Sequence, residues 1–374
     1  MKLKHIILYY PSMERGGVTI NLKHLITYLT NKNMKVSLVS NNFDSRKINL
    51  KKENFFFFRI GSKFESSFLS NRWFIAFSSI KYLIKSFSKY KKENTVVLSM
   101  QSSMVAIIIC KIFGIKVVAR NSEDPISSTK YADNYFLAII IFVLRFFIYN
   151  LANGILTNSF GSKKSLRLFV LNKNKIKAIY NPYLLKINKK KKVIKKNIIL
   201  SVGRLCKQKD FFTLILGFSK FVKKFPKFKL IILGDGPDKN KLNNLIKNSH
   251  LEKKILIKGW VKNTGKYFSS AKVFALTSLY EGLGNVFIDA VNYEVPCVYT
   301  NCKSGPNEIL LNKKGGFQTK IRDQHDLNKK LEKCVSNYSK SKKMIMYAKT
   351  KIDRFYYKSI CPKYLKYLRE ICIN

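Results

Sequence analysis

Two cationic residues, Arg204 and Lys209, lie in a loop that is expected to follow a buried strand at 197–202 and to precede a helix. A guanidinium can bind two oxygens of a diphosphate as a fork, and a lysine ammonium acts as a point charge. A glycine-rich loop further along contains Glu281 and leads into a helix opening near Asn285. Backbone N–H groups at the start of a helix can bind a phosphate. In a chain with 71 Lys and Arg residues, two cations taken alone carry little weight.

Several kinds of chemistry lack their residue patterns. No two Asp residues stand two positions apart, so the Asp-x-Asp pattern of metal-dependent sugar transfer is absent from the sequence. There is no Walker sequence and no G-x-G-x-x-G, which argues against an ATPase and a dinucleotide oxidoreductase. The four His residues are far apart, and the seven Cys residues contain no C-x-x-C. We therefore expect no metal or other cofactor, and thiols buried in a protein of a reducing cytoplasm.

Strands that alternate with helices predict a parallel α/β fold in two halves. Within the first half we expect one helix around 71–89, another at 159–171 and strands at 6–10, 35–40, 55–60, 95–99, 116–120, 154–158 and 176–180. A lysine-rich linker follows at 183–197, and the pattern restarts with strands at 197–202, 229–233, 255–258, 273–276 and 296–300. After Leu310 the chain should be mainly helical, with a break at Pro362.

Further candidate residues stand just after expected strands, at the sheet edge where parallel α/β folds bind ligands. Gly16 and Gly17 follow the first strand and precede a helix. Two glycines in this place would suit a tight turn and would equally allow the close approach of a phosphate or sugar. The turn at 234–237 and the pair Arg120–Asn121 occupy corresponding places after later strands.

Segment 134–153 is dense in Ile, Phe, Leu and Tyr, and Arg145 lies inside it. Three interpretations of this segment remain open: a helix packed in the core, a helix lying in the plane of a membrane, and a helix that spans the membrane. The apolar run 135–144 is shorter than the roughly 20 residues that a span needs. The net charge of +50 predicts attraction to polyanions, either nucleic acid or acidic lipid, although biased composition explains it equally well.

Four motifs occur together and in order: Val202-Gly-Arg-Leu-x-x-Gln-Lys-Asp, Leu233-Gly-Asp-Gly-Pro, Gly259-Trp-Val and Ser278-Leu-Tyr-Glu-Gly-Leu-Gly-Asn-Val-x-Ile-Asp-Ala. The sequence closely resembles the GT-B glycosyltransferases of family 4, and the Gly16–Gly17 loop matches their N-terminal signature. The segment Cys302-Lys-Ser-Gly-Pro-Asn-Glu-Ile-Leu resembles the branch that builds bacterial surface polysaccharides, including N-acetylgalactosaminyl- and galactosyltransferases.

The resemblance implies two Rossmann-like domains whose parallel sheets face each other across a cleft. These would be an acceptor-binding domain at 1–182 and a nucleotide-sugar-binding domain at 198–350, with a helical segment at 351–374 packing back toward the first domain. It also implies retaining, metal-independent transfer of a hexose or N-acetylhexosamine from a UDP-linked sugar. The acceptor would be an oligosaccharide on undecaprenyl diphosphate, in O-antigen or capsule synthesis.

By motif matching, Arg204 and Lys209 would stabilise the leaving diphosphate and Glu281 would hydrogen-bond the donor sugar; these three form the expected catalytic set. Asp289 stands where the family usually has Glu, whose role is to bind the ribose, and Arg120 stands where many members carry His. The implied donor-binding residues are Gly17, Gly234, Gly236, Val261, Gly284, Asn285, Val286 and Asp289, and the acceptor-side residues are Gly16, Arg120 and Asn121.

We therefore expect a cytoplasmic enzyme held peripherally on the anionic inner face of the cell membrane, without a nucleic-acid partner. One alternative is a GT-B nucleotide-sugar epimerase or hydrolase, which would release sugar without a lipid acceptor. The other is a basic nucleic-acid-binding protein, although no recognised RNA or DNA module accompanies the charge.

Overall fold

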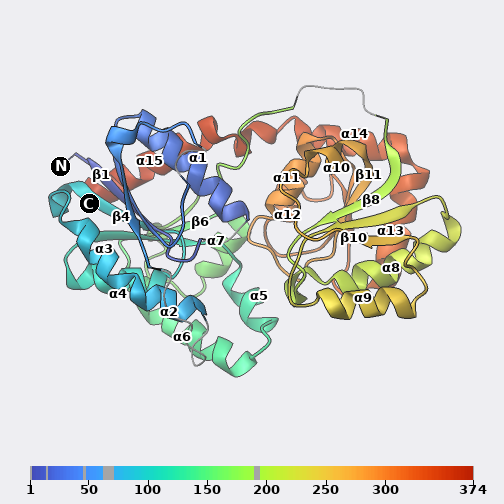
Figure 1. Ribbon diagram of the computed structural model, residues 1–374, viewed down its shortest axis with the longest axis horizontal. Coiled ribbons are helices and arrows are strands. Elements are labelled where there is room, and N and C mark those ends of the chain that lie inside the picture. Colours follow the sequence, from blue (N-terminus) through green and yellow to red (C-terminus); the bar gives the residue numbers. More distant parts are fainter. Residues whose placement is uncertain (1, 14–15, 45–47, 62–70, 189–193, 374) are drawn as a thin grey trace. The chain divides into compact units, whose positions relative to one another are not determined.

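The computed structural model describes residues 2–13, 16–44, 48–61, 71–188 and 194–373, with the side chains of 71–74 left aside. The chain divides into two compact units (Figure 1). The first unit comprises Met1–Leu185 together with Arg354–Asn374, and the second comprises Lys186–Asp353. Within the lysine-rich linker predicted at 183–197, residues 189–193 lie outside the described part of the chain. Each unit is described below by itself.

The first unit is built on a seven-stranded parallel sheet in the order β3-β2-β1-β4-β5-β6-β7. Its strands are β1 (His5–Tyr9), β2 (Lys35–Ser40), β3 (Phe55–Arg59), β4 (Thr95–Ser99), β5 (Lys116–Asn121), β6 (Gly154–Thr157) and β7 (Ile176–Ala178). Its helices are α1 (Gly17–Asn31), α2 (Asn71–Ser78), α3 (Ile80–Phe87), α4 (Ser103–Ile112), α5 (Pro125–Lys130), α6 (Tyr135–Leu151), α7 (Phe160–Leu166) and α15 (Tyr357–Ile373), with short 3₁₀ turns between several elements.

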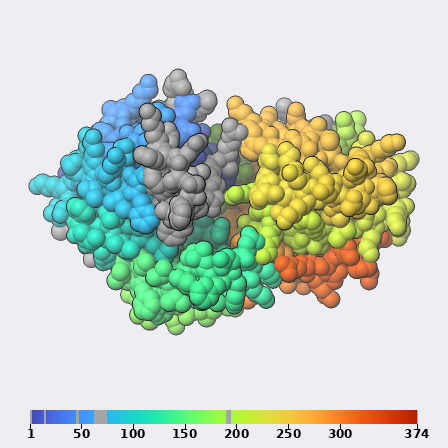
Figure 2. Space-filling model, turned by 60° about the horizontal axis from the view of Figure 1, so that its bottom comes forward, coloured from blue at the N-terminus to red at the C-terminus, as the bar shows by residue number. Residues whose placement is uncertain are grey.

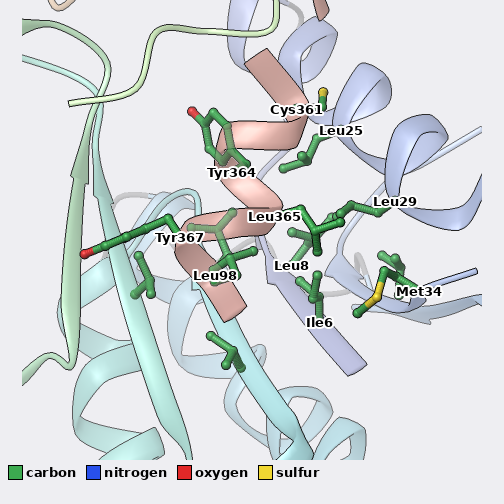
Figure 3. Packing of buried hydrophobic residues seen from close by; sticks show 14 of the residues in the cluster. Ile6, Leu8, Leu25, Leu29, Met34, Leu98, Cys361, Tyr364, Leu365 and Tyr367 are labelled. Carbon is green, nitrogen blue, oxygen red and sulfur yellow. The ribbon is translucent and has the colours of Figure 1, made fainter. Parts of the chain in front are cut away.

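Side chains alternate across the strands of this sheet, so each face has its own core. Ile6 and Leu8 of β1 face α1 and α15, while Ile7 and Tyr9 face α3, α4 and α7. Figure 3 shows the first of these cores, where Leu365 and Tyr364 of α15 lie against the strands and α1. The last helix therefore completes the first unit, although the whole second unit separates it from the rest in sequence.

The second unit is built on a six-stranded parallel sheet in the order β10-β9-β8-β11-β12-β13. Its strands are β8 (Lys196–Val202), β9 (Lys229–Leu233), β10 (Ile255–Ile257), β11 (Ala271–Leu276), β12 (Cys297–Thr300) and β13 (Phe317–Thr319). Its helices are α8 (Phe211–Lys224), α9 (Lys239–Asn248), α10 (Gly265–Ser270), α11 (Asn285–Asn292), α12 (Pro306–Ile309), α13 (Gln324–Ser336) and α14 (Tyr338–Lys349). The two parallel sheets confirm the predicted α/β fold.

Several element boundaries differ from the sequence prediction. The helix expected around 71–89 is two helices, and the Ser79 hydroxyl at their junction bonds the Ala76 carbonyl at 2.6 Å. The helix expected at 159–171 ends at Leu166. The break expected at Pro362 is wrong, because α15 continues through it. Proline removes one helical hydrogen bond there, and the burial of α15 against the sheet offsets that loss.

Helix α6 corrects the first of the three interpretations of segment 134–153. The helix begins at its cap Asn134, whose side chain accepts from the Leu137 N–H at 2.9 Å, and ends at Leu151. Tyr149 is its one buried residue, and Phe142, Phe146 and Ile148 pack partly buried against the core, so α6 packs on the core along one side only. In the described part of the chain, no helix combines the length and the apolar character that crossing a bilayer requires.

Candidate active site

The carboxyl ends of β8 and β11 lie where the strand order of the second sheet reverses. These strands are neighbours, but the chain leaves β8 toward β9 on one side and leaves β11 toward β12 on the other. Open parallel sheets bind ligands in the crevice at such a switch point. The loops after the two strands carry Arg204, Lys209 and Glu281, so strand order brings the three predicted catalytic residues to one place.

Backbone and side-chain hydrogen bonds join these two loops. The Leu279 N–H donates to the Gln208 carbonyl at 2.8 Å, and the Gln208 side-chain amide donates back to the Tyr280 carbonyl at 3.0 Å. The buried Thr277 hydroxyl donates to the Asp210 carbonyl at 2.7 Å. The position of Glu281 is therefore fixed relative to Lys209 by three connections besides their own contact.

Lys209 and Glu281 form an ion pair between Nζ and Oε1. Their side chains are only 15% and 7% exposed, so water screens the pair weakly. The Ser278 hydroxyl donates to the same Oε1 at 2.7 Å, and the Ser304 hydroxyl donates to the Glu281 carbonyl at 2.6 Å. The sequence predicted both charged residues but not their contact, and it assigned no role to Ser278 or Ser304, although both stand within its motifs.

The backbone that carries Lys209 adopts a conformation that its neighbours support. Asp210, the cap of α8, has φ of 45°, and its carboxylate accepts from the Thr213 hydroxyl at 2.7 Å and the Thr213 N–H at 3.3 Å. Asp tolerates this left-handed region better than most residues and is a favoured helix cap. Burial raises the pKa of the Asp210 carboxyl above its usual value. An Asp directly before a helix was the signal that would have identified this residue.

Arg204 is exposed on the first of these loops, next to the buried Leu205. The backbone beside it is tied to the turn after β9, because the Leu205 N–H donates to the Asp235 carbonyl at 2.9 Å. A Cβ at Gly234 would collide with the Gly203 carbonyl oxygen, and one at Gly236 would collide with the Leu205 carbonyl oxygen. Close packing of the two loops thus accounts for both glycines.

The segment after β10 lies beside the same turn, since the Gly234 N–H donates to the Gly259 carbonyl at 2.8 Å. Val261, two residues further on, is half-buried. The turn after β9 thus stands between the segment containing Val261 and the loop containing Arg204.

The entrance to α11 contains the remaining predicted donor-binding residues. Gly284 caps the helix with φ of 78°, a conformation that strains other residues. A Cβ at Gly305, which also has φ of 78°, would lie 2.6 Å from the Leu283 carbonyl oxygen, so the loop before α12 packs on this entrance. Asn285 and Val286 form the first turn of α11 and are half-buried, as is Asp289 one turn later. The N–H groups of a first turn have no partner within the helix and carry partial positive charge.

The first unit contains a cavity of about 370 Å³ at the corresponding edge of its own sheet. It lies where β1 and β4 are neighbours and the chain leaves them in opposite directions. The Ser12 N–H donates to the Gln101 side chain at 3.2 Å and joins the two loops there. The lining also includes Asn121 and, on the inner side of α6, Arg145. The sequence had placed Arg145 only within an apolar helix, without a part in a site.

Arg120 lines this cavity, but the residue is 3% exposed and its guanidinium has three partners in the fold. Nε donates to the Tyr364 hydroxyl at 3.4 Å, Nη1 to the Ser122 hydroxyl and Nη2 to the Asn181 side-chain oxygen Oδ1. The Asn121 amide donates to the Glu123 carbonyl. Arg120 thus holds the end of β5 to α15, a positioning role that the sequence did not predict.

Gly16 and Gly17 stand at the entrance of α1, where Gly17 is the first helical residue. A Cβ added at Gly16 would meet open space, so packing does not require glycine there, but its φ of 158° is one that other residues rarely adopt. Across the described residues, no three His, Cys, Asp or Glu side chains gather closely enough to hold a metal ion.

Comparisons with known proteins agree with this architecture. An uncharacterized glycosyltransferase of Methanocaldococcus jannaschii is 34% identical over 225 residues, which are 56% of this chain and 55% of that protein. A Campylobacter jejuni enzyme is 30% identical over 266 residues, covering 70% of this chain and 72% of that enzyme. Its name is N-acetylgalactosamine-N,N'-diacetylbacillosaminyl-diphospho-undecaprenol 4-alpha-N-acetylgalactosaminyltransferase.

Solved structures show the same fold. The crystal structure of Anabaena HepE in complex with UDP and glucose aligns with a TM-score of 0.78 at 16% identity, covering 98% of this chain and 100% of that chain. Residues 185–351, which make up most of the second unit, match the family described as Glycosyl transferases group 1. The chain belongs to this family and is a glycosyltransferase with the GT-B fold.

Proposed function

We propose that the enzyme transfers a hexose or N-acetylhexosamine from a UDP-linked sugar to a lipid-linked oligosaccharide, with retention at the anomeric carbon and without a metal. The observation that carries this proposal is the Lys209–Glu281 pair at the switch point of the second sheet. It combines a cation suited to a diphosphate with a carboxylate suited to sugar hydroxyls.

Charge separation determines what these groups contribute. When the bond between sugar and diphosphate breaks, negative charge grows on the diphosphate and positive charge grows on the ring. Lys209, Arg204 and the first turn of α11 are positive groups at the same sheet edge, so they can stabilise the leaving group as a metal would in other enzymes. Glu281 would accept from donor-sugar hydroxyls, and Asp289 would bind the ribose directly or through a water.

Retention at the anomeric carbon requires either a covalent intermediate or attack by the acceptor on the face from which the nucleotide diphosphate departs. The Oε1 of Glu281 accepts from both Lys209 and Ser278, and these contacts reduce its strength as a nucleophile. Glu281 and Asp289 stand on a loop and the following helix of one unit, not as a facing pair of carboxylates. These features favour front-side attack by the acceptor hydroxyl.

The acceptor and donor assignments draw on the relatives. The Campylobacter enzymes are named for N-acetylgalactosaminyl transfer to undecaprenol-linked glycans, and HepE was solved with UDP-glucose. In this chain, the cavity of the first unit would hold the acceptor, with Asn121 in its lining and Arg120 fixing its wall.

A donor screen followed by a transfer assay tests the proposal. We expect one of UDP-Gal, UDP-GalNAc, UDP-Glc and UDP-GlcNAc, and not GDP-Man, to raise the melting temperature. That donor should extend a short-chain polyprenyl-diphosphate glycan in the presence of EDTA, and proton NMR should show the donor's anomeric configuration in the product. Inversion would contradict front-side attack, loss of turnover in EDTA would contradict metal independence, and rapid release of free sugar without acceptor would favour a hydrolase.

A further inference from the structure

The outer side of α6 is an unusual surface for a water-facing helix. Nine of its large apolar side chains are exposed, among them Phe136 at 75% and Phe147 at 63%. At 3.6 residues per turn, six of the nine fall within an arc of about 100°. We name this arc the α6 face; it consists of Phe136, Ile140, Val143, Leu144, Phe147 and Leu151. In Figures 1 and 2 the helix runs along the lower edge of the first unit.

The inner side of α6 is firmly packed. Phe142 contacts Phe169 edge-on with ring centroids 4.9 Å apart, and Phe146 and Ile148 pack on the core shared with α3, α4 and α7. Tyr149 is buried and Arg145 lines the cavity of the first unit. The orientation of the α6 face is therefore fixed by the fold.

Neighbouring elements extend this apolar surface. Ile108 and Ile112 are exposed on α4, which packs against α6. Leu171, also exposed, lies at the end of α6, since its N–H donates to the Asn150 side-chain oxygen at 2.8 Å. Large contiguous apolar surfaces of this kind mark interaction sites.

Charge indicates which partner fits. Within residues 131–171 the sequence has one acidic residue, Asp133, against Arg145, Lys163, Lys164 and Arg167. Lys130 and Lys173 are exposed close in sequence to elements at the two ends of α6, and the Lys175 ammonium donates to the Asn150 carbonyl at 3.2 Å. Lys164 and Arg167 are exposed on the neighbouring segment of α7. Two copies of a chain with net charge +50 would repel each other across such a surface, whereas an anionic lipid surface would attract it.

We propose that α6 lies in the plane of an anionic bilayer, with the α6 face about 5–10 Å deep at the boundary between headgroups and acyl chains. The basic residues near its ends contact lipid phosphates. Arg145 and Tyr149 then line the cavity from the opposite side of the docked helix. This deepens the proposed function, because a lipid-linked acceptor must be reached from a membrane surface.

Vesicle cosedimentation of the full chain tests the proposal. Wild-type protein should bind phosphatidylglycerol–phosphatidylethanolamine vesicles and bind phosphatidylcholine vesicles at least about tenfold more weakly. Combining Phe136→Ser with Phe147→Ser should lower partition onto the anionic vesicles by about tenfold or more, because two aromatic side chains no longer enter the lipid. The matched control combines Leu256→Ser with Tyr347→Ser, two exposed apolar residues of the second unit, and should bind like the wild type.

Two further measurements separate the possible failures. Both double variants should keep the wild-type melting temperature and the same shift with the donor, so a lost donor response would concern the proposed function and not the α6 face. Equal vesicle binding by wild type and the α6 double variant would overturn the docking proposal. So would sedimentation as a dimer that the α6 double variant alone converts to a monomer, since a second copy would then cover the face.

Discussion

The ion pair between Lys209 and Glu281 allows its structural and catalytic contributions to be separated. Replacing Lys209 by Met leaves the Glu281 carboxylate, 7% exposed, with the Ser278 hydroxyl as its described donor on Oε1. Removing one partner of a fully buried pair costs about 3–5 kcal/mol. Since Lys209 retains some solvent contact and Ser278 remains, we expect a loss of about 2 kcal/mol. For a unit of this size that loss lowers the melting temperature by about 4–8 °C.

Adding Glu281→Gln to Lys209→Met should recover most of this stability, because no buried charge is then left unpaired. We expect the double variant to lie within about 1 kcal/mol of the wild type in chemical denaturation. Its turnover should not recover, because a preorganised cation facing the leaving group contributes about 3–4 kcal/mol to the transition state. Turnover should fall at least tenfold, and as far as about 10³-fold, in both the single and the double variant.

Two results would refute this reasoning. If the double variant is no more stable than Lys209→Met, an unpaired Glu281 carboxylate is not the cause of the instability. If either variant retains turnover close to wild type in the transfer assay, Lys209 does not stabilise the leaving diphosphate.

Three further outcomes follow from the structure. Gly234→Ala should lose more than about 2 kcal/mol of unfolding free energy, because its Cβ meets the Gly203 carbonyl, whereas Gly61→Ala, whose Cβ would meet only the Tyr82 hydroxyl at 3.9 Å, should be as stable as the wild type; equal stability of both variants would contradict the close packing of the loops. Burial lowers the pKa of His5 to about 4, so the folded state holds the neutral ring and its stability should fall as pH drops from about 6.5 toward 4, by up to about 3 kcal/mol, a pH dependence that His5→Asn should remove in denaturation curves. Arg145→Gln should raise KM for the lipid-linked acceptor several-fold and leave the donor-induced melting shift unchanged, and an unchanged acceptor KM would exclude Arg145 from the acceptor site.

The sequence predicted the parallel α/β class well because its strands are short apolar runs between turn residues, as at 197–202 and 229–233. It could not predict the contact between Lys209 and Glu281, which are 72 residues apart and meet only because β8 and β11 are neighbours. Strand order is a property of the folded sheet and leaves no local mark on either loop. β13, only three residues long, was missed within a region expected to be mainly helical.

Glycines illustrate a second limit of sequence reasoning. From position alone, the role of Gly16–Gly17 could be either a tight turn or the close approach of a ligand, and the motif assigned Gly234 and Gly236 to donor binding. The structure separates the two cases, because Gly234 and Gly236 are required by the backbone of the neighbouring loop, while Gly16 faces open space and is favoured by its own φ of 158°. Only the distance to that neighbouring backbone, which the sequence does not contain, distinguishes the two causes.

Helix α6 shows why periodicity failed for segment 134–153. A surface helix of a water-soluble protein turns its charged side outward and its apolar side inward. In α6 nearly every residue is apolar, so no stripe marks the inner side, and the single charge Arg145 lies opposite the α6 face, against the protein. An inward charge is stabilised where a cavity supplies water or an anionic ligand, and an outward apolar arc is stabilised where lipid replaces water. Both conditions hold together if the cavity receives the diphosphate of an acceptor whose lipid remains in the bilayer under α6.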